Sequence, residues 1–479
     1  MKSVSRIDME FQDKIKHLYN RACFGVPLNT VSSKQEIKDI IHHLIYAKST
    51  HTTLQVASLE EVEKLQADIK SMPKETAKEL RKAIRDRQVQ LNQLWLEQMV
   101  NSSNTLQEKM ALFWHGHFAC RSSNPFFDQQ YVEIIRKNAL GNFGTLLKEI
   151  SKSPSMLQFL NNQQNKKEHP NENFAREVME LFTIGRGNYT EHDIKEAARA
   201  FTGFAFDKSA QFIFRKKQHD DGVKLIFGKT GNFDGDDVLE MLLEKKECAH
   251  FIATKVYRFF VNDVVNENNV QQLSDVFYNS GYDIQKLLHA IFSSNWFYNI
   301  ENRGCKIKSP IELLVGYTRI IPFQFTDNKS NVFIQKSLGQ ELLNPPNVAG
   351  WPGGKNWIDS SSLLFRMRLP QALYFEQAIN FTPKATIAEV YSYTNNTIMD
   401  SYIKFAVKKI KTQFDWSAIV QQFNASSDVV KDISNTILIS PPSQASLSAV
   451  RKSIESYTSE SAIKSAAISI MSLPEYQLC

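Results

Sequence analysis

The sequence predicts a mainly α-helical protein, with a multi-helix, bundle-like body that carries a small β-hairpin insert. Apolar residues recur at the three- and four-residue spacing of helix faces over most of the 479 residues. Capping-box patterns, in which a Ser or Thr precedes a Glu or Asp by three residues, mark several helix starts. The alternation of apolar residues that is typical of strands is confined to one short stretch near the middle of the chain.

The first hundred residues are predicted to be helical. Residues 11–23 carry an apolar face and are followed by a glycine stop. Ser33 and Glu36 form a predicted capping box for the next helix. Residues 59–99 are rich in charge and broken near Pro73, which predicts a long helical hairpin with a solvated outer face.

The next hundred residues carry two more helix starts. Thr105 and Glu108 form a predicted capping box that opens the helix with the segment FWHGHF (113–118). Thr190 and Asp193 form a related start. Both predicted helices begin close to polar, aromatic-rich segments, where functional residues are expected.

A short β element and a second helical region follow. Apolar residues alternate over 212–227 around an Asp-Asp-Gly turn at Asp220–Gly222, which predicts a β-hairpin. Helices resume over 236–297 and again from Pro310. A loop rich in Pro and Gly, NPPNVAGWPGGKNW at Asn344–Trp357, interrupts this second region.

These patterns divide the chain into four segments. The length permits two or three domains, or equally one large helical body with insertions. The segments are an N-terminal helical region (1–205), the β-hairpin insert (206–235), a second helical region with the Pro/Gly/Trp loop (236–380) and a C-terminal helical region (381–479).

Bulk composition excludes several classes of protein. The net charge of +6 is spread along the chain without a basic tail or stripe, so no nucleic-acid partner is expected. The five cysteines lie far apart without a C-x-x-C pair, which predicts reduced, mostly buried thiols. No run reaches transmembrane length and the first residues lack a signal-peptide core, so the sequence as written predicts a soluble, cytoplasmic protein.

The segment FWHGHF is the first candidate for chemistry. On a helix, Glu108 and His115 share a face and can form a proton-transfer pair or supply two metal ligands. His117 lies about 200° round from His115, so both can face one ligand only if Gly116 distorts or ends the helix. The structural alternative is that Glu108 is a cap and the histidines are satisfied core residues.

The segment NENFAREVMELF (171–182) is the second candidate. Asn173, Glu177 and Glu180 share a helical face, and Arg176 lies close by with glutamates at i−4 and i+4. The structural alternative is a salt-bridged helix start with Asn171 as the N-cap. The functional alternative is an acidic site that meets the histidines of FWHGHF, as in helical di-metal proteins, although no Glu-x-x-His pair is present.

Two loops supply further candidates. The dipeptide His219-Asp220 can bind a metal or act as an oriented base, but such pairs are common by chance. The neighbouring glycines do not form a phosphate-binding loop, because the residues between them read as a strand. Trp351 and Trp357 in the Pro/Gly loop can stack on a sugar or peptide if exposed, or anchor the loop if buried.

Several segments, taken in order, resemble the bacterial domain of unknown function 1800 family. They are HLYNRACFG, FWHGHF, PNENFAREVMELFTIGRGNYTEHDIKEAARAFTGF, HDDGVKLIFGKTGNFDGDDV, KSPIELLVG, NPPNVAGWPGG and LPEYQLC, and together they span nearly the whole chain as one family domain.

This resemblance implies a mostly helical fold but no established activity, substrate or cofactor. It also implies an exported, periplasmic location and a sulfatase-like partner protein, although the chain shows no export signal. The family singles out ten polar positions, namely His115, His117, Asn171, Glu172, Asn173, Arg176, Glu177, Glu180, His219 and Asp220.

Two classes of function follow. The first is an enzyme, hydrolytic or metal-assisted, whose site lies between the FWHGHF and NENFARE helices and whose cofactor is a divalent metal ion. In it the histidines act as base or metal ligand, the glutamates as ligands or acid/base groups, and Arg176 as an anion clamp. The candidate catalytic residues are His115, His117, Arg176, Glu177 and Glu180, and the candidate metal ligands are His115, Glu177, Glu180, His219 and Asp220.

The second class is a non-catalytic binding or assembly protein. In this interpretation the polar segments are buried networks, and the protein acts with the sulfatase-like partner or binds a glycan or peptide. The candidate binding residues are Asn173, Trp351 and Trp357.

Overall fold

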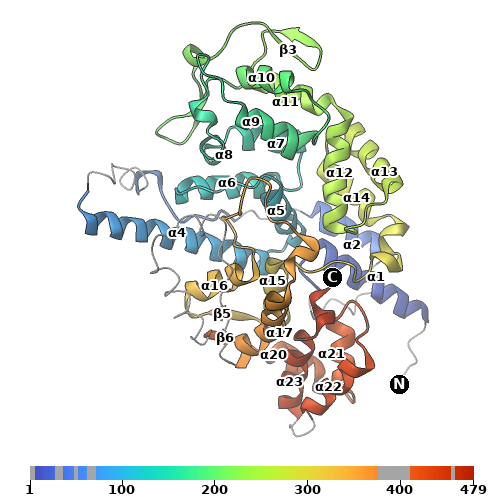
Figure 1. The fold of residues 1–479 in the computed structure, drawn as a ribbon. Coiled ribbons are helices and arrows are strands. Elements are labelled where there is room, and N and C mark those ends of the chain that lie inside the picture. Colours follow the sequence, from blue (N-terminus) through green and yellow to red (C-terminus); the bar gives the residue numbers. More distant parts are fainter. Residues whose placement is uncertain are drawn as a thin grey trace.

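A computed structural model describes residues 6–26, 28, 36–47, 52–61, 72–375, 410–454 and 459–479. Over these residues the protein is mainly α-helical, and the described strands form three small two-stranded antiparallel sheets (Figure 1). The predicted fold class is therefore confirmed. No described helix is long and apolar enough to cross a membrane.

Helix α5 (Thr105–His117) lies at the centre of the N-terminal region. It contacts α1, α2, α4 and α6, and every residue except Gln107 and Gly116 is buried, so it is a core helix on all its faces. The other helices of this region are α1 (Arg6–Ala22), α2 (Ile37–Tyr46), α4 (Lys74–Asn101), α6 (Pro125–Asn138), α7 (Phe143–Ser151), α8 (Pro154–Phe159) and η2 (Asn162–Gln164).

The predicted capping box at the start of α5 is wrong. The N-cap is Asn104, whose side chain accepts a hydrogen bond from the Gln107 backbone, and Glu108 instead pairs with Arg136 inside the core. Ser33 of the first predicted box lies outside the described residues, and Glu36 is itself the N-cap of α2.

The NENFARE segment forms two joined helices of different kinds. These are α9 (Glu172–Glu177), which Asn171 caps as predicted, and η3 (Val178–Thr183), a π-helix. A π-helical turn is rare and rotates the residues that follow it relative to a continuous α-helix. After a short loop, Thr190 and Asp193 form the predicted capping box of α10 (Glu191–Ala200).

The β insert contains two hairpins and not one. Strand β1 (Phe204–Phe206) pairs with β2 (Phe212–Phe214), and β3 (Lys224–Ile226) pairs with β4 (Lys229–Gly231). The predicted pairing across Asp220–Gly222 is wrong, because that segment is tied to α10. The second hairpin turns instead at Phe227 and Gly228, whose positive φ angles suit a two-residue hairpin loop.

The second helical region begins with a group of helices at the right of Figure 1, in which α12 (Lys246–Phe260) packs on α13 (Glu267–Asn279). Strand β5 (Phe323–Phe325) pairs with β6 (Thr412–Phe414), a sheet that the sequence did not predict. The helices are α11 (Gly235–Glu244), α12 (Lys246–Phe260), α13 (Glu267–Asn279), α14 (Ile284–Phe292), η5 (Asn295–Tyr298), η6 (Ile300–Asn302), α15 (Pro310–Ile320), α16 (Asn328–Leu338), η7 (Gly354–Trp357) and α17 (Ser360–Phe375).

The C-terminal helices form a group at the bottom of Figure 1, where α21 and α22 pack on α23. The last residues then return to the body: Lys308 donates its backbone N–H to Gln477, and Cys479 donates to Lys306, each at 2.8 Å. The elements are α20 (Ser417–Phe423), α21 (Val429–Ile437), α22 (Gln444–Ile454), α23 (Ser459–Met471) and η8 (Pro474–Gln477).

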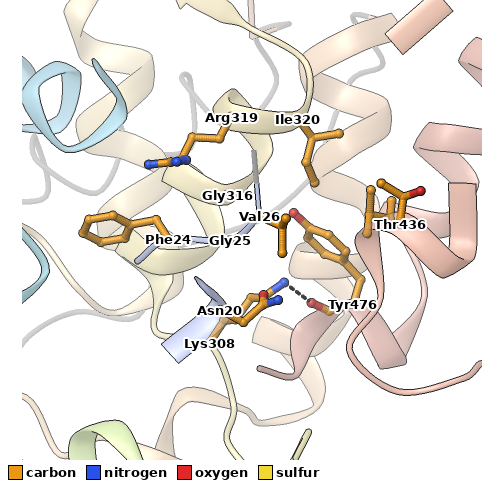
Figure 2. Close-up of a pocket in the computed structure, with 11 residues that line it drawn as sticks. Asn20, Phe24, Gly25, Val26, Lys308, Gly316, Arg319, Ile320, Thr436 and Tyr476 are labelled. Carbon is orange, nitrogen blue, oxygen red and sulfur yellow. Dashed lines mark hydrogen bonds between the residues drawn. The ribbon is translucent and has the colours of Figure 1, made fainter. Parts of the chain in front are cut away.

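A small internal cavity of about 10 Å³ lies where this returning segment meets α1 and α15 (Figure 2). It has room for about one water molecule. On its wall Lys308 donates a 2.8 Å hydrogen bond to the Tyr476 carbonyl oxygen, and its ammonium also lies over the Tyr476 ring. This contact fixes the C-terminal segment onto the start of α15.

All five cysteines are free thiols, as predicted, and four of them are buried.

Candidate functional site

The polar side chains of α5 each contact a different part of the chain. Glu108 receives hydrogen bonds from Arg136 of α6 at 2.8 Å and from the Trp95 indole of α4 at 3.1 Å. Lys109 pairs with Glu312 of α15. Both charged groups are buried and paired, so they hold helices together and are satisfied structural ions.

His115 contacts the tryptophan loop, which is the Pro/Gly-rich segment 344–357 that contains both tryptophans, and the residue that leads into it. Its Nε2 accepts a 3.0 Å hydrogen bond from the Leu343 backbone N–H, and its ring lies 5.3 Å from that of Trp351. Burial lowers the pKa of His115 to about 3, so the ring is neutral. Because Nε2 accepts, Nδ1 carries the proton, and within the described part of the chain Nδ1 has no hydrogen-bond partner.

His117 faces a different direction, because α5 ends there. Its Nε2 lies 3.1 Å from the Phe182 carbonyl oxygen, and its Nδ1 lies 3.1 Å from Lys255 Nζ. A carbonyl can only accept, so Nε2 carries the proton and Nδ1 accepts from Lys255. Burial, reinforced by the Lys255 charge, holds the pKa of His117 well below its usual value and keeps the ring neutral.

Lys255 of α12 is the second member of this pair. Its amine also donates a 3.0 Å hydrogen bond to the Leu181 carbonyl oxygen and lies 4.6 Å from the centre of the Phe251 ring. Burial and the nearby Arg258 charge lower the pKa of Lys255 to about 8. No carboxylate of the described residues forms an ion pair with it.

The π-helix η3 links the two sequence segments that carry most of the predicted site. Its consecutive carbonyls at Leu181 and Phe182 hold Lys255 and His117 respectively. Carbonyls at a helix C-terminus lack intrahelical partners and carry partial negative charge, so they suit a cationic amine and an imidazole N–H.

The charged residues of the NENFARE segment form a separate network. Arg176 pairs with Glu191 at 2.7 Å and with Glu172 at 3.2 Å. Glu180 bonds Tyr189 and Arg186, and these contacts lower its pKa.

Two other members of that segment make no contact with the histidines. Glu177 is half-buried, and burial followed by the charge of Glu180 raises its pKa. Asn173 donates to the Leu160 carbonyl oxygen at 3.3 Å. No hydrogen bond or ion pair joins these residues to His115 or His117 in the described structure.

The His-Asp dipeptide ties the β insert to α10. His219 Nδ1 lies 2.9 Å from the Thr202 carbonyl oxygen, and Asp220 accepts from Arg199 at 2.7 Å. These contacts occupy the segment that the sequence predicted to be a hairpin turn.

The predicted metal ligands therefore lie in separate places. His115 is at the tryptophan loop, Glu180 is on the arginine network, and His219 and Asp220 are on the β insert. Glu177 lies on α9, with no hydrogen bond or ion pair to the other predicted ligands in the described structure. Over the described residues, no group of three or more His, Cys, Asp or Glu side chains is arranged to hold a metal ion.

A cavity of about 530 Å³ opens beside the His117–Lys255 pair. Its walls come from the end of α5, from α12, from the residues that lead into α15, and from the tryptophan loop. Both predicted tryptophans line it: Trp351 is half-buried and Trp357 is 7% exposed. The aromatic lining residues are Phe113, Phe259, Trp351 and Trp357.

The cavity carries an excess of positive charge. Four cationic side chains line it, and only one of them is neutralised by an acidic lining residue, since Lys306 pairs with Asp263. The other acidic lining residue, Glu312, is taken by Lys109. In the described structure no carboxylate pairs with the remaining three, which are Lys255, Arg258 and Lys355.

A family model described as "Protein of unknown function (DUF1800)" matches residues 17–478. The chain belongs to this family. No curated protein and no solved structure matched it. The DUF1800 match runs through FWHGHF, the NENFARE segment and the tryptophan loop, so all walls of the cavity lie within one family domain.

The sequence did not point to the cationic residues of this DUF1800 cavity. Lys255 and Arg258 belong to an ordinary amphipathic helix and match no motif. The available signal was their spacing, because two like charges at i and i+3 repel each other on a helix and are slightly unfavourable there.

Proposed function

We propose that this DUF1800 protein binds an acidic saccharide in the cavity beside His117 and Lys255. The observation that carries the proposal is the combination of two cations without carboxylate partners, Arg258 and Lys355, with two tryptophans that line the same cavity. The excess charge attracts sulfate, phosphate or carboxylate groups. Aromatic faces pack against sugar rings, and the volume lies within the usual range for small-molecule sites.

Calorimetric titration with matched saccharides tests this proposal. We expect a disaccharide that contains a uronic acid or a sulfate to bind, and its neutral counterpart to bind at least ten times more weakly. Lys355→Ala should weaken binding at least ten-fold, since a charge-assisted hydrogen bond contributes about 1.5–3 kcal/mol. Trp351→Ala should also weaken binding, because it removes an aromatic face that a sugar ring packs against. Lys431→Ala, an exposed lysine of α21, is the control. Equal binding of neutral and acidic saccharides would contradict the proposal.

Catalysis on the bound saccharide is the second candidate function. It is favoured by the Lys255 amine, which has a pKa of about 8 and lines the cavity with His117 as its hydrogen-bond acceptor. Such a group can serve as a base near neutral pH in an acid–base hydrolysis. Turnover should be lost in Lys255→Met while saccharide binding changes only a few-fold. Elemental analysis of the purified protein tests the metal-assisted version.

The sulfatase-like partner and the location are proposals that rest on the family resemblance and on the sequence alone. Co-expression with such a partner followed by affinity purification tests the first. Fractionation of cells that express the chain tests whether it is cytoplasmic or periplasmic.

A further inference from the structure

The environment of the Lys255 amine differs from that of an ordinary buried lysine. A buried lysine normally pairs with a carboxylate, but the two acceptors of Lys255 are both uncharged: the Leu181 carbonyl oxygen at 3.0 Å and His117 Nδ1 at 3.1 Å. The charge of Arg258, three residues further along α12, lowers the pKa of the amine further.

The number of acceptors matches the neutral form of the amine. A neutral amine has two N–H bonds and one lone pair, whereas an ammonium has three N–H bonds. The two N–H bonds of the neutral amine donate to the Leu181 carbonyl oxygen and to His117 Nδ1, and the nitrogen lone pair remains free. A third proton would find no acceptor among the described residues, which adds to the effect of burial and of Arg258.

The amine is also within reach of a ligand. Lys255 is half-buried, and its side chain lines the 530 Å³ cavity together with Arg258 and Trp351. A desolvated lysine beside a second cation is the arrangement that activates lysine as a nucleophile toward carbonyl groups.

We infer that Lys255 forms a covalent imine with an aldehyde or ketone group of a ligand held in this cavity. The amine lone pair attacks the carbonyl carbon, a C–N bond forms, and a proton moves from nitrogen to oxygen to give a carbinolamine. Loss of water breaks the C–O bond and leaves a C=N bond, so amine and carbonyl become imine and water. Both ring nitrogens of His117 are already hydrogen-bonded, so His117 positions the amine and takes no part in the proton transfer.

Reductive trapping in the full-length protein tests this inference. Pyridoxal 5′-phosphate is the probe, because it combines an aldehyde, an aromatic ring and a phosphate, and borohydride reduction makes the adduct permanent. Mass spectrometry of the tryptic peptides measures how fast each lysine is labelled. We expect Lys255 to be labelled at least ten times faster at pH 7 than Lys306 and Lys355, which line the same cavity.

A pH series and a variant sharpen the test. Labelling of Lys255 should rise to half its maximum near pH 8, where an ordinary lysine is almost fully protonated. Arg258→Met should shift this midpoint to higher pH, because it removes a charge that favours the neutral amine. Arg258 is exposed, so this substitution leaves the packing of the core unchanged. Uniform labelling of all three lysines, or an unlabelled Lys255, would overturn the inference.

The same experiment separates the imine from the proposed saccharide site. 5-Deoxypyridoxal, which lacks the phosphate and cannot close to the cyclic hemiacetal that pyridoxal forms, tests the carbonyl chemistry alone. If it labels Lys255 as fast as the phosphorylated probe, the imine stands and the preference for anions fails. If acidic saccharides bind but neither probe labels Lys255, the saccharide site stands and the imine is refuted.

Discussion

At the scale of single residues, the buried ion pair between Lys109 and Glu312 makes the stability of the protein depend on pH. Burial on its own raises the pKa of Glu312, but the Lys109 charge and hydrogen bonds from Lys109 and Ser309 outweigh it and lower the pKa to about 2. A carboxyl with a depressed folded-state pKa stabilises the protein above its unfolded pKa of about 4.5. That stabilisation is lost as the pH falls from about 4.5 through about 2.

We therefore expect Glu312→Gln to lower the free energy of unfolding at pH 7 by about 3–5 kcal/mol, because Lys109 is left buried without a counter-charge. Urea denaturation between pH 2 and pH 7 measures this, and the acid-induced loss of stability should be smaller in the variant than in the wild type. Glu240→Gln is the matched control, because Glu240 pairs with Lys148 at the surface and should change stability by less than about 1 kcal/mol. Equal effects of the two substitutions would refute this account.

His115 gives the second prediction at this scale. His115→Phe keeps an aromatic ring but removes the acceptor of the Leu343 N–H, so a buried donor is left unpaired. We expect a loss of about 1–3 kcal/mol in stability and faster hydrogen exchange at the Leu343 amide. If His115 instead acts in catalysis, as the sequence predicted, turnover would fall while this amide stays protected.

At the scale of elements, the tryptophan loop depends on close contact with the end of α5. Gly350 has a φ of +78°, and a Cβ added there would overlap the Gly116 carbonyl oxygen. Gly353 has a similar φ of +64° but open space around its Cα. Substitution of Gly350 therefore adds a steric clash to backbone strain, whereas substitution of Gly353 causes backbone strain alone.

Gly350→Ala should displace the loop and weaken ligand binding more than ten-fold. Gly353→Ala should cost about 1–3 kcal/mol in stability, because its φ of 64° and ψ of 179° lie in a region that is essentially restricted to glycine, but it should leave the contact with Gly116 in place. Titration with the same acidic disaccharide, together with thermal unfolding, measures both effects. Indistinguishable variants would mean that the loop does not rest on Gly116.

The sequence predicted the positions of the helices better than it predicted where they end or which side chains they contact. Apolar spacing predicted α1 and α4, because burial of one face leaves a periodic pattern, whereas α5 and α10 were predicted from capping-box patterns. Glu108 was predicted to be a capping residue because a glutamate three residues after Thr105 fits a capping box. The same glutamate can equally form a buried ion pair, as it does with Arg136. Asp220 was misread as a turn because its partner, Arg199, lies on the preceding helix, and no local pattern records that contact.

The candidate site was predictable only in part. The sequence drew attention to His117, Trp351 and Trp357, which line the cavity, because such residues are unusual in a helical core. It did not predict that Lys255 and Arg258 would join them. Their convergence depends on how α12 packs against η3 and α5, and that is a property of tertiary structure.

At the scale of the whole molecule, the C-terminal segment completes the body. Tyr476 is buried, its ring stacks on Tyr317 at 5.3 Å, and Leu478 pairs with Ile307, a residue that lines the ligand cavity. Removal of residues 474–479 should therefore reduce both stability and ligand affinity.

We expect this truncation to lower the free energy of unfolding by more than about 2 kcal/mol, since burial of one large side chain alone contributes about 1.5–3 kcal/mol. Thermal unfolding and saccharide titration measure the two effects. Tyr476→Phe is the control, because it keeps the ring and every backbone contact and should behave almost as wild type. A truncated protein with unchanged affinity would show that the cavity forms without this segment.

The walls of the ligand cavity come from stretches as distant in the chain as Leu112 and Trp357. Contacts between such distant segments form late in folding, because long loops must close before any of them is gained. A partly folded intermediate therefore has no complete cavity and no affinity for the ligand. A ligand that binds only the native state stabilises that state by mass action and so increases the fraction of molecules that refold. For this protein, the yield of refolding with and without a candidate ligand becomes an assay for ligand identity that needs no knowledge of the reaction.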